Sequence, residues 1–117
     1  MISIKKIALA LLLSVSAVAV APVLAQESAA VSAATEAAEV IGHIEKGLAE
    51  VQKSDFSAGT LHLKAARAAS EKIQGNEATV KEGLNAINQG MIQGKYGDVA
   101  KSTAELNKAI TIYQSIK

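Results

Sequence analysis

The stretch that decides the fold is "GLAEVQKSDFSAG", residues 47–59, because a related version of it follows downstream as "GLNAINQGMIQGKYGDVA", residues 83–100. Both versions open with Gly-Leu and continue with an aliphatic helical face. Each then reaches an aromatic residue, Phe56 or Tyr96, that a small residue follows. This is the pattern of a helix that ends, turns and restarts. The sequence therefore predicts two related helical hairpins.

Apolar residues recur every three or four positions in four segments, which is the spacing of helices with one buried face. The four predicted faces are Ala34, Ala37, Ile41, Ile44, Leu48 and Val51; His62, Ala66, Ala69 and Ile73; Val80, Leu84, Ile87 and Met91; and Val99, Ser102, Leu106, Ala109, Ile110 and Tyr113. Pro22 is the only proline, and no segment alternates apolar and polar residues as a strand would. The fold class is therefore predicted to be all-α.

Two hairpins with one apolar face each can bury those faces against each other. We therefore predict an antiparallel up-down-up-down four-helix bundle, built from duplicated helical hairpins at about residues 33–74 and 77–116. A solenoid of tetratricopeptide type is the rival, because "GKYGDVA", residues 94–100, is similar to the turn of those repeats. Two hairpins fall short of the roughly three repeats that a solenoid needs, so we expect the closed bundle, as a monomer.

Turn residues mark the predicted ends of the helices. Ser57 is the expected N-cap of the second helix and Asp98 that of the fourth, while Gly75 suits the left-handed position after the second helix. Three more glycines flank the third apolar face: Gly83, Gly90 and Gly94. A glycine inside a helix costs roughly 0.5–1 kcal/mol relative to alanine, and a close approach between helices would offset that cost. The alternative is that these glycines only make the third helix weak and flexible.

Residues 1–25 have the three parts of a secretory signal peptide: two lysines, an apolar run, and the small-residue site "VLA" at residues 23–25. The apolar run is shorter than the roughly 20 residues that span a bilayer, which favours cleavage over a membrane anchor. We expect a Sec-type signal peptide cleaved after Ala25 and a bacterial protein that is periplasmic or secreted. The mature chain, residues 26–117, is then one domain without stable membrane insertion.

The composition of the mature chain excludes several classes of function. Removal of two leader lysines leaves 10 basic residues against 11 acidic ones, a formal net charge of −1. A near-neutral chain without a basic cluster is a poor nucleic-acid binder. There is no cysteine, so thiolate chemistry and disulfides are excluded. No phosphate-binding loop, nucleophile elbow or H-E-x-x-H motif is present, and we expect no catalytic activity.

Two histidines are the candidate ligands of a metal ion. Glu39 and His43 are four residues apart on a predicted polar face, so their side chains can meet and hold a divalent ion with water in the remaining positions. His62 is placed on the inward face, as a second and separate candidate. The alternatives are a solvated polar face for His43 and a neutral core imidazole for His62. In a simple hairpin centred on Phe56 the two histidines differ in height by ~10 Å, which disfavours one shared site.

The segments "IGHIEKGLAEVQKSDFSAGTLHLKAARAASEKI" (residues 41–73) and "VKEGLNAINQGMIQGKYGDVAKSTAELNKAI" (residues 80–110) resemble the repeats of the small metal-binding protein family. This resemblance covers about residues 39–112. It implies a periplasmic, cysteine-free four-helix bundle that binds copper or other divalent metals, with His43 and His62 at positions where the family carries histidine. Several positions depart from further family histidines: Glu50, Gln89, Lys95, Ser102 and Thr103.

The expected function is therefore weak binding of Cu²⁺ or a similar ion, led by His43 with Glu39. Binding should weaken in acid, because a protonated imidazole cannot ligate a metal. The alternative is a non-catalytic interaction or structural module of the cell envelope that has lost metal binding. Under that alternative, Phe56 and Tyr96 at equivalent hairpin tips contact a partner or a membrane surface, unless each ring folds back as a plug over its own hairpin.

Overall fold

The computed structural model describes residues 33–117, which form four α-helices. The first helix is described over residues 33–52 and is followed by α2 (Phe56–Ser70), α3 (Glu77–Lys95) and α4 (Val99–Gln114). No strand occurs within the described residues, so the all-α prediction is confirmed. The predicted signal peptide and the first residues of the mature chain, up to residue 32, lie outside this part.

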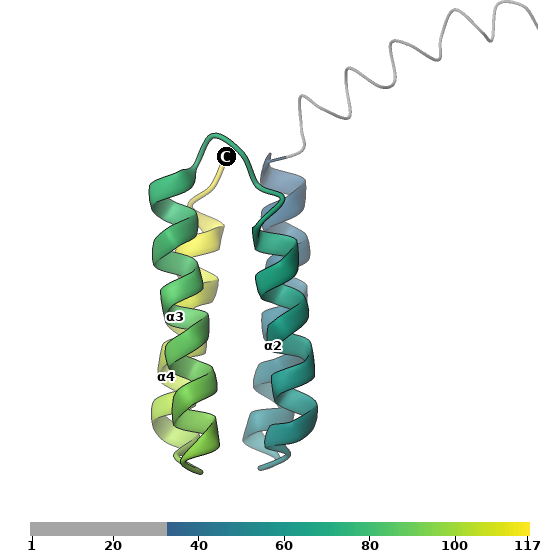
Figure 1. Cartoon of the computed structure of the whole chain (residues 1–117), viewed down its shortest axis with the longest axis vertical. Coiled ribbons are helices and arrows are strands. Elements are labelled where there is room, and N and C mark those ends of the chain that lie inside the picture. The colour runs from purple at the N-terminus through teal and green to yellow at the C-terminus, as the bar shows by residue number, and fades with distance from the viewer. Residues whose placement is uncertain (1–32) are drawn as a thin grey trace, which may run out of the picture. The chain divides into compact units, whose positions relative to one another are not determined.

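The helices pack as two antiparallel hairpins, one made of the first helix and α2, the other of α3 and α4 (Figure 1). Both hairpin turns lie at the same end of the bundle. The connection from α2 to α3 crosses between the hairpins at the opposite end, where the C-terminus also lies. This is the predicted up-down-up-down four-helix bundle.

The core lies between the four helices and is made of aliphatic and small side chains plus one aromatic ring. Its most buried members are Val40, Ile44, Leu63, Ala66, Ile87, Leu106, Ala109 and Tyr113, each at most 1 % exposed. Tyr113 has the largest fully buried side chain of the described residues. Burying a large side chain fully contributes about 1.5–3 kcal/mol, so packing of these faces stabilises the bundle.

The predicted helical faces are correct except at their edges. Val40 is fully buried although the predicted face omits it, and Ala34 is exposed although the prediction includes it. In α2 the buried position belongs to Leu63, so its neighbour His62 is half-buried at the flank of the core. His62 therefore lies at the edge of the inward face, and Leu63 takes its centre. A face with a period of 3.6 residues admits either of two neighbours at its edge, and the packing of the other helices decides which of them is buried.

The predicted N-cap of α2 is also wrong, because Asp55 takes that role. Its Oδ1 accepts a hydrogen bond from the backbone N–H of Ala58 at 3.1 Å, and the helix has already begun at Phe56, before Ser57. Asp98 caps α4 as expected, accepting from the backbone N–H of Lys101 at 2.9 Å. Both caps have the usual spacing of three residues between the acceptor and the N–H that it satisfies.

Small residues let the helices of each hairpin approach closely. A Cβ built on Gly90 of α3 would lie 2.5 Å from Cδ2 of Leu106 on α4. Beside it, the hydroxyl of Ser102 donates a hydrogen bond of 2.7 Å to the carbonyl oxygen of Gly90, across the pair. In the other hairpin, a Cβ on Gly47 would lie 3.2 Å from the carbonyl oxygen of Gly59. These contacts are the close approach that the buried glycines predict.

Candidate metal site on the first helix

Glu39 and His43 meet on the outer surface of the first helix. The Nε2 atom of His43 lies 3.7 Å from Oε2 of Glu39, and the two side chains are 28 % and 47 % exposed. The pair is a direct consequence of helix geometry, because residues four apart stand one above the other on the same face. The predicted contact is therefore present. It combines an imidazole and a carboxylate, both ligand types for divalent metals.

His62 lies nearer to the level of His43 than the sequence predicts. A Cβ on Gly59 would lie 3.3 Å from the carbonyl oxygen of Gly47 and 3.6 Å from the amide nitrogen of Val51, so Gly59 faces the midpoint of that helical turn. His62 then stands level with about residue 46, roughly 5 Å from His43 along the helix axis at 1.5 Å per residue. The sequence places the centre of the hairpin two residues too late, which gave the larger estimate of ~10 Å.

The structure offers a metal ion few protein ligands. Among residues 33–117, no three His, Asp or Glu side chains lie close enough together to hold one ion. Another acid of the first helix, Glu50, is paired instead with Lys53, at 3.8 Å between Oε2 and Nζ. The donor set at Glu39 and His43 therefore amounts to two protein atoms, and water must supply the other positions. Such a set fits a weakly held, exchangeable ion rather than a structural one.

The two aromatic residues at the hairpin tips are not equivalent. Phe56 is half-buried at the start of α2 and packs against the core, and a Cβ on Gly94 would lie 3.4 Å from its Cδ1 atom. Tyr96 follows the last residue of α3 and is 79 % exposed. Phe56 therefore covers its end of the core as a plug, whereas Tyr96 does not fold back. The predicted symmetry of the tips fails because one ring belongs to a helix start and the other to a helix end.

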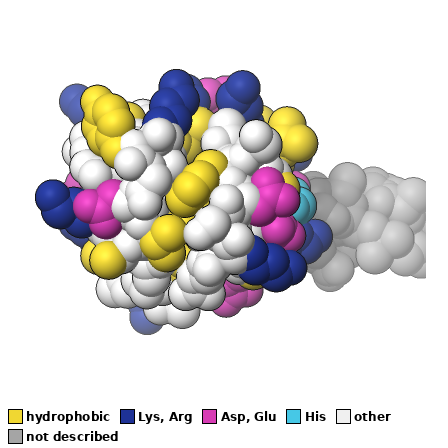
Figure 2. Space-filling view, turned by 90° about the horizontal axis from the view of Figure 1, so that it is seen from below, with side chains coloured by type: hydrophobic (Ala, Val, Ile, Leu, Met, Phe, Trp, Pro, Cys, Tyr) yellow, Lys and Arg dark blue, Asp and Glu magenta, His cyan; other side chains and the backbone are white. Residues whose placement is uncertain are grey.

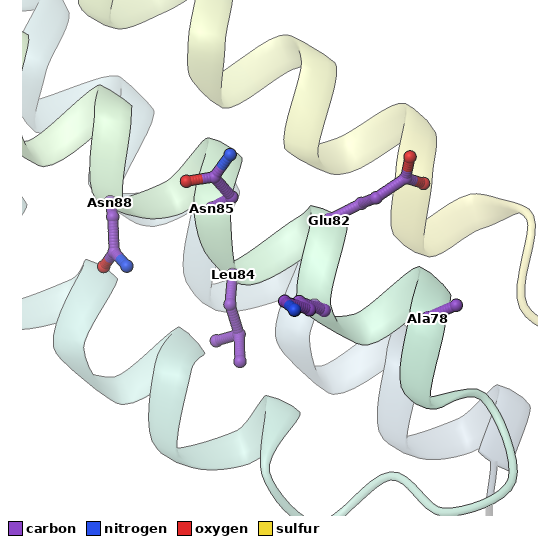
Figure 3. Close-up of a pocket in the computed structure, with 6 residues that line it drawn as sticks. Ala78, Glu82, Leu84, Asn85 and Asn88 are labelled. Atoms are coloured by element: carbon purple, nitrogen blue, oxygen red, sulfur yellow. The ribbon is translucent and has the colours of Figure 1, made fainter.

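A cavity of about 570 Å³ on the outer face of α3 does not form a binding site. Its lining residues are Ala78, Lys81, Glu82, Leu84, Asn85 and Asn88. Figure 3 shows that Glu82 points toward α4 whereas Leu84 and Asn88 point toward the other hairpin. Their side chains diverge, and a binding site needs polar groups that converge on one point. The cavity is an open hollow between side chains.

Sequence reasoning missed a set of exposed side chains near the hairpin tips. Leu61 on α2 is 69 % exposed, and it lines an open cavity of about 470 Å³ together with Lys64 and with Lys95 of α3. The signal that could have revealed this surface is the absence of acidic residues from the whole of α2. Leu61 also lies outside the predicted apolar face of α2, about 200° around the helix from the buried Leu63.

No protein-family model matches this sequence, and no curated protein matches it. The resemblance to small metal-binding proteins therefore stays a prediction that rests on the quoted segments. Within residues 33–117, none of the helices combines the length and the apolar character needed to cross a bilayer. The fold and the local geometry of the side chains are the basis for the function proposed below.

Proposed function

We propose that this protein is a small, non-catalytic helical bundle, exported to the periplasm or secreted, that weakly captures a divalent cation of the copper type. The observation that carries the proposal is the contact between His43 and Glu39, with 3.7 Å between Nε2 and Oε2 on an accessible helical face. Both ligand atoms are held by one rigid helix, so little order has to be created when an ion arrives.

The chemistry of the two side chains favours a particular group of ions. Imidazole nitrogen suits copper, nickel and zinc, and the affinity of such a site should be highest for Cu²⁺ among the divalent ions of the first transition row. The carboxylate of Glu39 adds negative charge beside the imidazole and disfavours loss of the cation to water. A protonated imidazole cannot bind a metal, so acid should release the ion.

His62 is proposed as a second and weaker position. It lies on α2, half-buried, and it has no carboxylate partner within ion-pair distance among the described residues. A single imidazole without a second protein ligand gives lower affinity than the pair on the first helix. Substitution of either histidine removes one imidazole, but only substitution of His43 disrupts the proposed site. The two substitutions are therefore matched controls for each other.

Calorimetric titration of the purified protein with Cu²⁺ tests the proposal. We expect His43→Ala to weaken the strongest binding step by at least about tenfold, because even the loss of a residue that only supports a ligand costs that much. Glu39→Gln should weaken it less, and His62→Ala should leave that step unchanged. The double variant His43→Ala/His62→Ala measures the contribution of the chain terminus and backbone. Unchanged binding in His43→Ala would show that the ion binds elsewhere.

A further inference from the structure

Three large hydrophobic side chains are exposed in the described part of the chain, and all three lie toward the hairpin-tip end of α2 and α3. They are Leu61 (69 %), Ile92 (40 %) and Tyr96 (79 %). Ile92 and Tyr96 are four residues apart at the end of α3 and therefore share one side of that helix. Single exposed hydrophobic residues are ordinary, but several on one surface mark a site of interaction.

Each of the two helices also carries a lysine next to its exposed apolar residue. Lys64 is one turn beyond Leu61 on α2, and Lys95 is one turn beyond Ile92 on α3, so each lysine shares a side of its helix with an apolar neighbour. Leu61, Lys64 and Lys95 also line one open cavity, which shows that the two helices present them together. We call Leu61, Lys64, Ile92, Lys95 and Tyr96 the tip face.

The tip face itself contains two lysines and no acidic residue. No Asp or Glu occurs in α2 from Phe56 to Ser70, and none occurs between residues 83 and 95 of α3, although the whole chain carries 11 acidic residues. The nearby acids Asp55 and Asp98 accept hydrogen bonds from backbone N–H groups at the starts of α2 and α4. Lys64, Arg67 and Lys95 form no ion pair within residues 33–117. The lysines of the tip face are therefore free to meet an anionic partner.

We propose that the tip face binds the surface of a lipid bilayer that bears anionic headgroups. The most exposed side chains of the tip face are Leu61 and Tyr96. Figure 2 shows hydrophobic side chains at the surface of this end, with basic and acidic side chains around them. A bilayer accommodates protruding side chains of this kind, whereas a protein partner needs a matching pocket for each. Tyrosine favours the membrane–water interface, and lysine stems extend along apolar surface to reach headgroups.

The proposed contact is peripheral and does not depend on the metal site. The helical backbone keeps its internal hydrogen bonds, so only side chains enter the interface and the bundle remains folded. Each basic residue close to an anionic surface strengthens binding roughly fivefold. The two lysines together should then give a preference of about 25-fold for anionic over neutral vesicles, lost at high salt because the attraction is screened.

The absence of tryptophan from the chain makes a site-specific test possible. A Leu61→Trp variant of the exported protein, without the predicted signal peptide, is mixed with vesicles of phosphatidylcholine, alone or with phosphatidylglycerol, and its fluorescence is recorded. We expect a blue shift with the anionic vesicles only. The matched control Ala104→Trp, at an exposed position of α4, should show no shift. Vesicle binding through another segment of the chain would leave both spectra unchanged, and this result would overturn the proposal.

A second set of variants reverses the charge of lysines in the same vesicle experiment. Added to Leu61→Trp, the pair Lys64→Glu/Lys95→Glu should abolish the shift, while Lys46→Glu/Lys108→Glu makes the same change of charge away from the tip face and should preserve it. All four lysines are exposed, and circular dichroism checks that each variant keeps its helices. Equal loss in both pairs would show attraction by net charge alone and would contradict a defined face. A shift with polyglutamate but not with vesicles would identify an acidic polypeptide as the partner instead.

Discussion

The hydroxyl oxygens of Ser70 and Tyr113 lie 2.5 Å apart in the core, where both residues are fully buried. Ser70 is the last residue of α2, and Tyr113 lies in the last turn of α4, so this hydrogen bond joins the two hairpins. The ring of Tyr113 also rests against Gly83 of α3, where an added Cβ would lie 2.5 Å from it. Three helices therefore meet at one tyrosine.

Removal of either hydroxyl should destabilise the bundle. We expect Ser70→Ala and Tyr113→Phe each to lower the free energy of unfolding by about 1–3 kcal/mol, because the remaining hydroxyl is buried without its partner. The double variant should lose clearly less than the sum of the two single losses. Urea denaturation followed by circular dichroism measures all three, with Ser57→Ala at an exposed position as the control. Strict additivity would show that the hydrogen bond contributes nothing in solution.

The same tyrosine should make the bundle sensitive to alkali. Burial raises the pKa of Tyr113 above its ordinary value of 10.0, and the hydrogen bond with Ser70 lowers it by less. The unfolded chain then loses this proton at about pH 10, while the folded chain still holds it. The stability due to this neutral hydroxyl is therefore complete below pH 10 and is lost as the pH rises through the folded-state pKa.

The measurement is urea denaturation between about pH 9 and pH 11. The free energy of unfolding of the native sequence should fall more steeply over this range than that of Tyr113→Phe. Comparison of the two slopes removes the contribution of lysines, which also titrate there. Parallel slopes would mean that Tyr113 ionises alike in both states.

The helices and their pairing could be predicted because periodicity and turn residues are local signals. The two hairpins can be recognised from their similar sequences, and Asp98 caps its helix as its position predicts. Ser70 and Ser102 could not be recognised as buried hydrogen-bonding residues, because each finds its partner on another helix. Asp55 was overlooked as a cap since Ser57 is an equally suitable residue type two positions later. The residue at which the backbone becomes helical, Phe56, decides between Asp55 and Ser57.

The candidate metal site could be predicted only where it depends on a single helix. Glu39 and His43 meet because of the helical spacing alone. The position of His62 depends on the height at which two helices pair, and contacts such as that between Gly59 and Gly47 determine that height. In the tip face, Tyr96 is predicted as a contact residue by the alternative function, but its grouping with residues of α2 is not. The grouping of Leu61 and Lys64 with Lys95 follows from the packing of α3 beside α2, which no pattern within α2 describes.

The glycines offer a pair of substitutions with opposite expected effects. Gly42→Ala should raise the free energy of unfolding by about 0.5–1 kcal/mol, because a Cβ there meets no atom within 4 Å and alanine is the better helix former. Gly83→Ala should lower it by about 1–3 kcal/mol, because the new methyl group overlaps the buried ring of Tyr113. Thermal denaturation of both variants checks this. Stabilisation by Gly83→Ala would mean that the two helices can separate at no cost.

The two aromatic residues at the hairpin tips should differ in their contribution to stability. Phe56→Ser should lower the free energy of unfolding by about 1–3 kcal/mol, less than the ~3–5 kcal/mol of a fully buried phenylalanine, because the ring is only half-buried against the core. Tyr96→Ser should change it by no more than about 0.5 kcal/mol, since that side chain is 79 % exposed. Melting temperatures of the two variants, measured side by side, compare them directly. A larger loss from Tyr96→Ser would show that Tyr96 folds back over its hairpin in solution and is not available to the tip face.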